Sequence, residues 1–195
     1  MYFKQKDFIF KYALTDLYEI TKILSSTGCE KMLRSKKVII VSHCLLNQNA
    51  VVPPLGRAKG GFPIATALLD EGIGIIQLPC PEFKFLGPTR EPMSKEQYDS
   101  VEYRELCKQL FQPVLEDLKK YIDDNYSIVG IIGIKESPTC SISNSRGIFM
   151  EEIFSILDKE GIKLDYFEIP TDYTENDDFS DLYEKLIVDL KLNSL

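Results

Sequence analysis

The segment IVGIIGIKESPTC, residues 128–140, decides the fold of this chain. Its first seven residues, 128–134, are almost purely apolar, as expected of a strand that is buried on both faces. Such strands occupy the centre of parallel sheets that helices cover on both sides. The segment then becomes polar at Lys135 and ends at Cys140. We therefore expect a central parallel strand that carries a thiol at the carboxyl edge of its sheet.

Two other stretches repeat this arrangement. The segments KVIIVSHC (37–44) and GIIQLPC (74–80) are rich in apolar β-branched residues and end at a cysteine. We expect strands over about 37–43, 74–78 and 163–168 in addition to the central one. Helical patterns separate them, which indicates right-handed βαβ crossovers. The predicted fold class is α/β: a three-layer open sheet of about four parallel strands, in the order 2-1-3-4, with helices on both faces.

Helical apolar periodicity fills the intervals between these strands. One helix contains Pro113, which should kink it or split it in two, because proline lacks an N–H and clashes with the preceding turn. A long loop is expected before that helix, over residues 80–93. The helices are expected over about 63–72, from the capping box at Ser94 past Leu118, over about 147–160, and after the acidic loop 171–178.

The length of 195 residues fits one domain with an appendage. We expect residues 1–35 to form a helical N-terminal extension and residues 36–195 to form the α/β domain. No apolar run approaches the length of a membrane span, and residues 1–31 lack the order of a signal peptide, so we expect a cytoplasmic protein without a membrane partner. The net charge of −7 would on average repel a phosphate backbone. A small-molecule substrate is therefore expected, and no nucleic acid polymer.

Five cysteines and a single histidine bound the metal chemistry. Cys44, Cys80 and Cys140 each follow a predicted strand, at the edge where parallel sheets bind ligands. Each of these cysteines taken alone would be interpreted as a buried core residue. Cys107 is interpreted in this way, because its helical spacing predicts core packing. Three thiolates at one edge instead indicate a site for a [4Fe–4S] cluster with one iron lacking a protein ligand, or for zinc with an open position.

Four polar residues lie near these cysteines in the sequence. Glu82 follows Cys80 by two positions and would activate water or protonate a leaving group, unless it is an ordinary surface carboxylate. The Ser137 hydroxyl would bind substrate or cluster sulfide, unless it only shapes the turn before Pro138. Asn47 would read a pyrimidine or amide edge, and Arg90 would bind an acidic substrate; capping or solvated surface is the alternative for both.

Three motifs resemble those of the thiouracil desulfidase family: SHCLLNQN (42–49), CPE (80–82) and ESPTC (136–140). The resemblance covers about residues 36–170. It implies a small α/β protein in which Cys44, Cys80 and Cys140 hold a [4Fe–4S] cluster whose fourth iron takes sulfur from a thiolated nucleobase. The implied activity is redox-neutral hydrolysis of a small thiocarbonyl compound, with release of sulfide.

Two segments differ from the better-known desulfidases, HCLLNQN (43–49) and FKFLGPTR (83–90), so the chain looks more like the related side branch of that family. The resemblance therefore supports the cluster better than it supports thiouracil as the substrate. A non-catalytic iron–sulfur or zinc-binding carrier or sensor is the alternative function. A metabolite-binding α/β domain without metal is a third.

Overall fold

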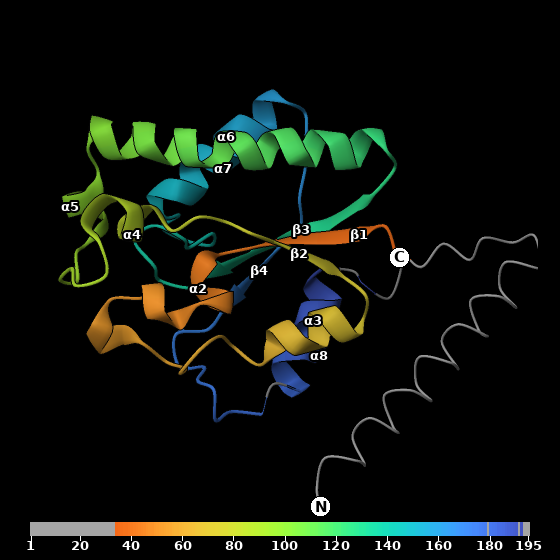
Figure 1. Ribbon diagram of the computed structural model, residues 1–195, viewed down its shortest axis with the longest axis horizontal. Helices are drawn as coiled ribbons and strands as arrows, with labels where there is room; N and C mark the ends of the chain where they lie inside the picture. Colours follow the sequence, from red (N-terminus) through yellow and green to blue (C-terminus); the bar gives the residue numbers. More distant parts are fainter. Residues whose placement is uncertain (1–33, 179, 191, 193–195) are drawn as a thin grey trace, which may run out of the picture. The chain divides into compact units, whose positions relative to one another are not determined.

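The computed structural model describes residues 34–178, 180–190 and 192 (Figure 1). The chain divides after Ser35, and the unit Lys36–Leu195 is described here by itself. Nearly all of the expected helical extension, 1–35, lies outside the described residues, as does Cys29. None of the helices in the described part is both long and apolar enough to cross a membrane.

Four parallel strands form the sheet, in the spatial order β2-β1-β3-β4. The predicted α/β class, the parallel pairing and the order are confirmed, and β3 lies inside the sheet as its apolar sequence predicted. The strands are β1 (Lys37–Val41), β2 (Gly74–Gln77), β3 (Ser127–Ile134) and β4 (Tyr166–Ile169).

Helices cover both faces of this sheet, as predicted (Figure 1). On one face, α3 (Ile64–Asp70) and α8 (Ser180–Asp189) pack on the side of β1 that carries Ile39 and Val41. On the other, α6 (Val101–Asp123) and α7 (Ile148–Lys159) pack on the side that carries Ile40. Because neighbouring residues of a strand point to opposite faces, one strand contributes to both cores.

The helix through Pro113 is not split in two, so that part of the prediction is wrong. α6 runs from Val101 to Asp123 as one helix. Pro113 and Gln109, whose carbonyl would accept the missing hydrogen bond, are both exposed, so water can satisfy that carbonyl. The break comes earlier, at Asp99 and Ser100, which separate α6 from the short helix α5 (Lys95–Tyr98).

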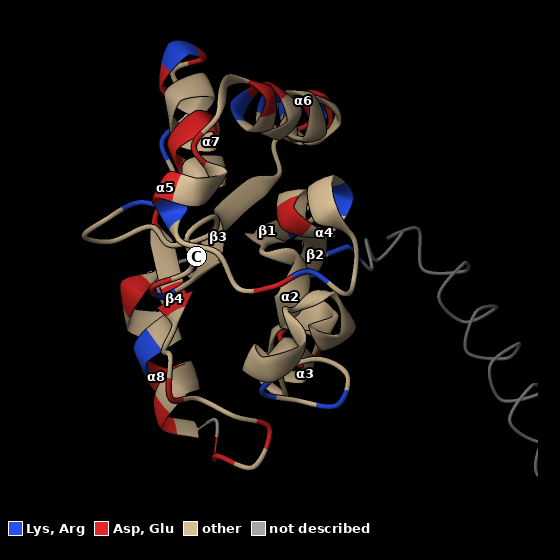
Figure 2. Cartoon of the chain, turned by 90° about the vertical axis from the view of Figure 1, so that its left-hand side faces the viewer, with Lys and Arg blue, Asp and Glu red and all other residues tan. Residues whose placement is uncertain are grey.

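Ion pairs join α5 to α7 and α6 to α7. Lys95 Nζ lies 2.5 Å from Glu151 Oε1 and donates to the carbonyl oxygen of Arg146 at 2.7 Å. Arg104 of α6 contacts Asp99, Glu151 and Glu152. Figure 2 shows charged residues of both signs on these helices. Partly exposed pairs of this kind contribute little each, but the network fixes where α5 lies.

The structure differs from the predicted elements in three places. β1 stops at Val41 rather than 43, because His43 starts the one-turn helix α2 (His43–Leu46). The predicted loop 80–93 contains the helix α4 (Pro81–Leu86), which begins with proline at its first position, a residue well suited to it. At the other edge of the sheet, β4 begins at Tyr166 rather than 163. Two 3₁₀ turns, Gln48–Ala50 and Pro53–Leu55, follow α2 in the chain.

Candidate active site

A cavity of about 370 Å³ lies beyond the carboxyl ends of the strands and brings the predicted cysteines together. Cys44, Cys80 and Cys140 all line it. Glu82, Ser137 and Arg90 line it as well, whereas Asn47 is not among the lining residues. Apolar side chains form much of its remaining wall: Ala50, Val51, Val52, Leu55, Pro92 and Met93.

Cys44 is held by the turn that follows β1. It is the second residue of α2, and its carbonyl oxygen accepts a hydrogen bond from Nε2 of Gln48 at 2.8 Å. The glycine at 61 permits a close approach from the other side, since a Cβ there would lie 2.9 Å from the carbonyl oxygen of Leu46. Gln48 also accepts from the N–H of Arg57 at 2.9 Å, so one buried amide joins the Cys44 turn to the loop that carries Arg57.

Cys80 lies at the N-cap of α4. Its sulfur accepts a hydrogen bond from the backbone N–H of Phe83 at 3.5 Å. An N-cap position offers unpaired backbone N–H groups and the positive end of the peptide dipoles, both of which stabilise a thiolate. Only Leu78 and Pro79 separate the end of β2 from Cys80, which begins α4. The sulfur of Cys80 therefore lies at the edge of the sheet and is stabilised by a backbone N–H group.

Cys140 is held by a turn that packs against the start of α7. The Ser137 Oγ accepts hydrogen bonds from the N–H groups of Thr139 (3.3 Å) and Cys140 (3.0 Å). The Thr139 carbonyl oxygen accepts from the N–H of Phe149 at 3.0 Å, which satisfies a free donor of the helix end. Ser137 thus shapes the turn, which is one of the two roles that the sequence predicted for it.

Replacing Gly147 by Ala should displace this turn. A Cβ at position 147 would lie 2.3 Å from the carbonyl carbon of Thr139, and the obstacle is backbone, which cannot move aside as a side chain can. We expect a loss of about 1–3 kcal/mol in the free energy of unfolding and weaker metal uptake at Cys140. Urea unfolding and metal content measure both, and Gly60→Ala is the control, because nothing lies within 4 Å of a Cβ there. Equal stability of the two variants would contradict this account of the turn.

Burial raises the pKa of all three thiols. Burial is the largest cause for Cys44 and raises its pKa to about 12, with Cys80 and Glu82 adding to the rise and Arg57 opposing it. Burial also raises the pKa of Cys140 well above its usual value, followed by the charges of Cys44 and Cys80. The pKa of Cys80 rises for the same first reason. These raised pKa values favour protonated thiols at neutral pH, so a metal that binds them would have to displace their protons.

This protonation predicts slow alkylation of Cys44 in the metal-free protein. With a pKa of about 12, only about 10⁻⁴ of the Cys44 side chain is thiolate at pH 8, against roughly a quarter for an unperturbed cysteine. Because the thiolate is the form above the pKa, the rate should rise about tenfold per pH unit between pH 8 and 10. Mass spectrometry after iodoacetamide treatment measures it. A rate at pH 8 as fast as that in denaturant would contradict the raised pKa.

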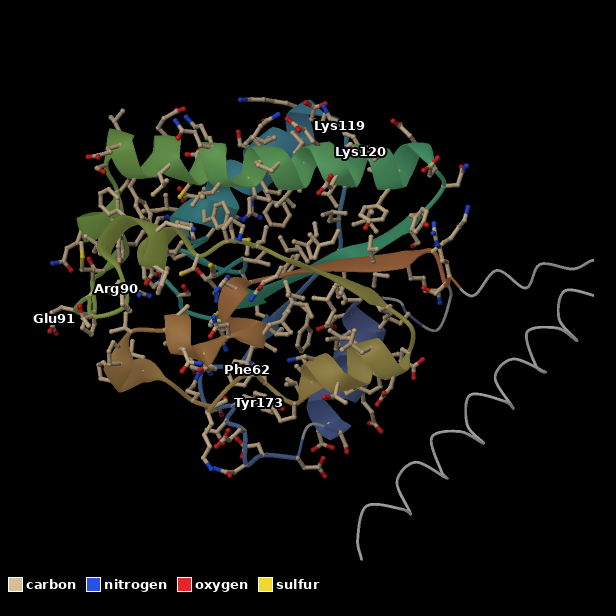
Figure 3. The ribbon with its side chains drawn as sticks, in the orientation of Figure 1. Phe62, Arg90, Glu91, Lys119, Lys120 and Tyr173 are labelled. Carbon is tan, nitrogen blue, oxygen red and sulfur yellow. The ribbon has the colours of Figure 1, made fainter. Side chains whose placement is uncertain are left out.

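Glu82 is held by two residues that the structure places around it. Arg90 donates to Oε2 of Glu82 through Nε (3.2 Å) and Nη2 (3.1 Å), and the Tyr98 hydroxyl donates to the same oxygen at 3.4 Å. The side chain of Arg90 is 3% exposed and also donates to the carbonyl oxygens of Gly87 and Ala50. Figure 3 shows Arg90 beside α4. Its guanidinium is thus largely committed to the protein, although a substrate-binding role was predicted for it.

Asn47 has a capping role in this geometry. Its Oδ1 accepts the N–H of Asn49 at 3.1 Å, and its Nδ2 lies 3.4 Å from Nε2 of His43. The other ring nitrogen of His43 lies 3.1 Å from the carbonyl oxygen of Leu78, which can only accept, so we assign the proton to Nδ1. His43 therefore links the ends of β1 and β2, and substrate binding by Asn47 stays a prediction.

Arg57 lines the cavity, and its charge lowers the pKa of Cys44. Its Nη1 donates to the carbonyl oxygens of Pro170 and of Tyr173, the latter at 3.2 Å. Its guanidinium lies over the ring of Phe62, which packs against Tyr173 with ring centroids 5.3 Å apart (Figure 3). The contacts of Arg57 and Phe62 with Tyr173, and that of Tyr98 with Glu82, could not be predicted from sequence, because each joins segments far apart in the chain.

Metal ligation was predicted for the three cysteines. Among residues 34–178, 180–190 and 192, the structure contains no group of three or more His, Cys, Asp or Glu side chains arranged to hold a metal ion. Cys107 lies fully buried in α6, as its spacing predicted, and is not among the cavity residues.

Comparisons with known proteins agree with the motifs that line the cavity. A family model described as "Putative 2-thiouracil desulfurase" matches residues 36–154. An uncharacterized protein of Methanocaldococcus jannaschii is 46% identical over 156 residues, which cover 80% of this chain and 99% of that protein. No solved structure matches the chain.

Proposed function

Because the chain belongs to the family described as "Putative 2-thiouracil desulfurase", we propose that it removes sulfur from a small thiocarbonyl compound by redox-neutral hydrolysis. The observation that carries the proposal is that Cys44, Cys80 and Cys140, from three separate motifs, line one cavity together with the carboxylate of Glu82. Three soft ligands with an acid–base group and an apolar wall suit the binding of a sulfur-containing heterocycle.

The donor set fits an iron–sulfur cluster. Cys44, Cys80 and Cys140 would each bind a different iron atom of a [4Fe–4S] cluster, so their sulfurs need not converge on one point as the ligands of a single ion must. When bound, the cluster would supply one iron without a protein ligand, a Lewis acid for a thione sulfur. Zinc held by the same three thiolates is the lesser alternative.

Glu82 would act as the general base. Its Oε2 is occupied by Arg90 and Tyr98, and no hydrogen bond reaches Oε1 from the part of the chain that the structure describes. Oε1 would take a proton from water as the water oxygen forms a bond to the thiocarbonyl carbon. Glu82 would then return this proton to the sulfur, and the carbon–sulfur bond would break with the bonding electron pair leaving on hydrosulfide. The remaining hydroxyl proton would pass to Glu82, so that the product is a carbonyl compound and the carboxylate can release the proton to solvent. No oxidant or reductant is consumed.

The remaining lining residues would hold the substrate. The Ser137 oxygen accepts from the N–H groups of Thr139 and Cys140, and its hydroxyl would donate a hydrogen bond to the substrate. The apolar side chains of Val51, Val52 and Met93 would contact the faces of a flat ring and exclude water from them. Only the reacting edge of the substrate then meets polar groups.

Anaerobic reconstitution followed by an assay with 2-thiouracil tests the proposal. We expect about four irons per chain, a broad brown absorbance, and sulfide released in step with uracil. One zinc per chain without colour, or a cluster without turnover of any thiocarbonyl compound, would favour the carrier or sensor function instead. Full-length protein is used, so that residues 1–33 are present in every sample.

A further inference from the structure

We propose that Tyr98 is a positioning residue which holds Oε2 of Glu82, so that Oε1 is the oxygen presented to the cavity; the proposal rests on the role of Glu82 proposed above. The hydroxyl of Tyr98 donates to Oε2 at 3.4 Å. In this proposal Tyr98 acts only through Glu82 and does not contact the substrate.

All three side-chain donors to Glu82 bind the same carboxylate oxygen, Oε2. An arginine commonly pairs with a carboxylate by giving one N–H to each oxygen. Here Nε and Nη2 of Arg90 both donate to Oε2, at 3.2 and 3.1 Å, and the Tyr98 hydroxyl reaches the same oxygen. Three donors on one oxygen fix the rotation of the carboxylate and leave Oε1 without a donor from the described residues.

Burial and ring stacking restrict the movement of the Tyr98 side chain. It is 1% exposed, and its ring stacks on that of Tyr103 with centroids 4.9 Å apart. Tyr103 is fixed in turn, because its hydroxyl is 3.0 Å from Oγ1 of Thr139, the residue next to Cys140. The helix α5 that carries Tyr98 is anchored to α7 through Lys95. A rigid hydroxyl is what the positioning of a carboxylate requires.

The hydroxyls of Tyr98 and Tyr103 contact different parts of the site. Tyr98 reaches the carboxylate that follows Cys80, whereas Tyr103 reaches the turn that carries Cys140. The pair therefore offers a matched comparison: each Tyr→Phe substitution removes one hydroxyl and keeps the stacked rings. Only the loss at position 98 should change how Glu82 is oriented.

The test combines a double-mutant cycle with kinetics on reconstituted full-length protein. The cycle uses Tyr98→Phe, Glu82→Gln and the double variant, with Tyr103→Phe in place of Tyr98→Phe as the control. We expect the effects of Tyr98→Phe and Glu82→Gln on the unfolding midpoint to be non-additive, because the two groups are in contact, and those of Tyr103→Phe and Glu82→Gln to be additive. In Tyr98→Phe we expect kcat to fall about tenfold, less than the loss expected for a general base itself, with KM and iron content unchanged.

Additive effects at positions 98 and 82 would overturn the proposal, as would an unchanged kcat or a loss confined to KM or iron. The proposed function fails separately: if the wild-type protein turns over no thiocarbonyl compound, that function is lost, while the unfolding cycle still decides whether Tyr98 holds Glu82.

Discussion

Replacing Cys80 by Ser is expected to abolish retention of the iron–sulfur cluster. Cys80 lines the cavity and its sulfur accepts the N–H of Phe83, and we propose it as one of the three cluster ligands. A serine hydroxyl keeps a similar shape and can keep that hydrogen bond, but it does not supply the soft, ionisable thiolate that iron in these clusters requires. Iron and acid-labile sulfide counted after anaerobic gel filtration measure the effect.

Cys107→Ser is the matched control for this substitution. Cys107 is a free, fully buried thiol in α6 that does not line the cavity, so its loss should leave the cluster in place. It should cost some stability, because a hydroxyl replaces a buried thiol in an apolar core. A Cys80→Ser protein with a full complement of iron, or equal loss in both variants, would remove Cys80 from the proposed ligand set.

Replacing Glu82 by Gln is expected to lower kcat by about 10²–10⁴-fold while the cluster stays bound. Gln has nearly the same shape and can still accept from Arg90, but a neutral amide cannot take a proton from water. Steady-state kinetics on reconstituted protein, with iron content measured on the same sample, give the result. Because the side chain of Arg90 is 3% exposed, loss of its charged partner should also lower the melting temperature.

Glu136→Gln is the control for this loss of charge. Glu136 is a second carboxylate that lines the same cavity, but it is exposed and its backbone φ is 62° in the turn before Ser137. We expect its kcat to change little. Full activity of Glu82→Gln would leave Glu136, Ser137 or a water molecule as the acting group. Loss of iron in that variant would make Glu82 a structural residue or a ligand.

The sheet could be predicted because its signals are local. The run 128–134 has to be buried on both faces wherever it lies, which places it inside a parallel sheet. The cysteines at 44, 80 and 140 follow from the same pattern, since the ends of parallel strands share an edge. The short helices α2 and α4 could not be predicted, because four to six residues show no helical period.

The surroundings of Glu82 could not be predicted, because they depend on packing between distant segments. Tyr98 is 16 residues from Glu82 in the sequence, and the carbonyl oxygen of Ala50 that holds Arg90 is 40 residues from it. The continuous helix through Pro113 has a similar origin, since the sequence does not say that Gln109 faces water there. Asn47 is another case: a polar residue beside a ligand edge caps a turn as readily as it binds a substrate.

The central claim, hydrolytic removal of sulfur, is tested most directly by the source of the product oxygen. Reconstituted protein is incubated without oxygen or reductant with 2-thiouracil in ¹⁸O-labelled water, and sulfide and uracil are quantified. We predict one sulfide for each uracil, with one ¹⁸O atom in place of the sulfur, and turnover without any electron donor. Sulfide release that requires a reductant, or uracil without the label, would contradict the account.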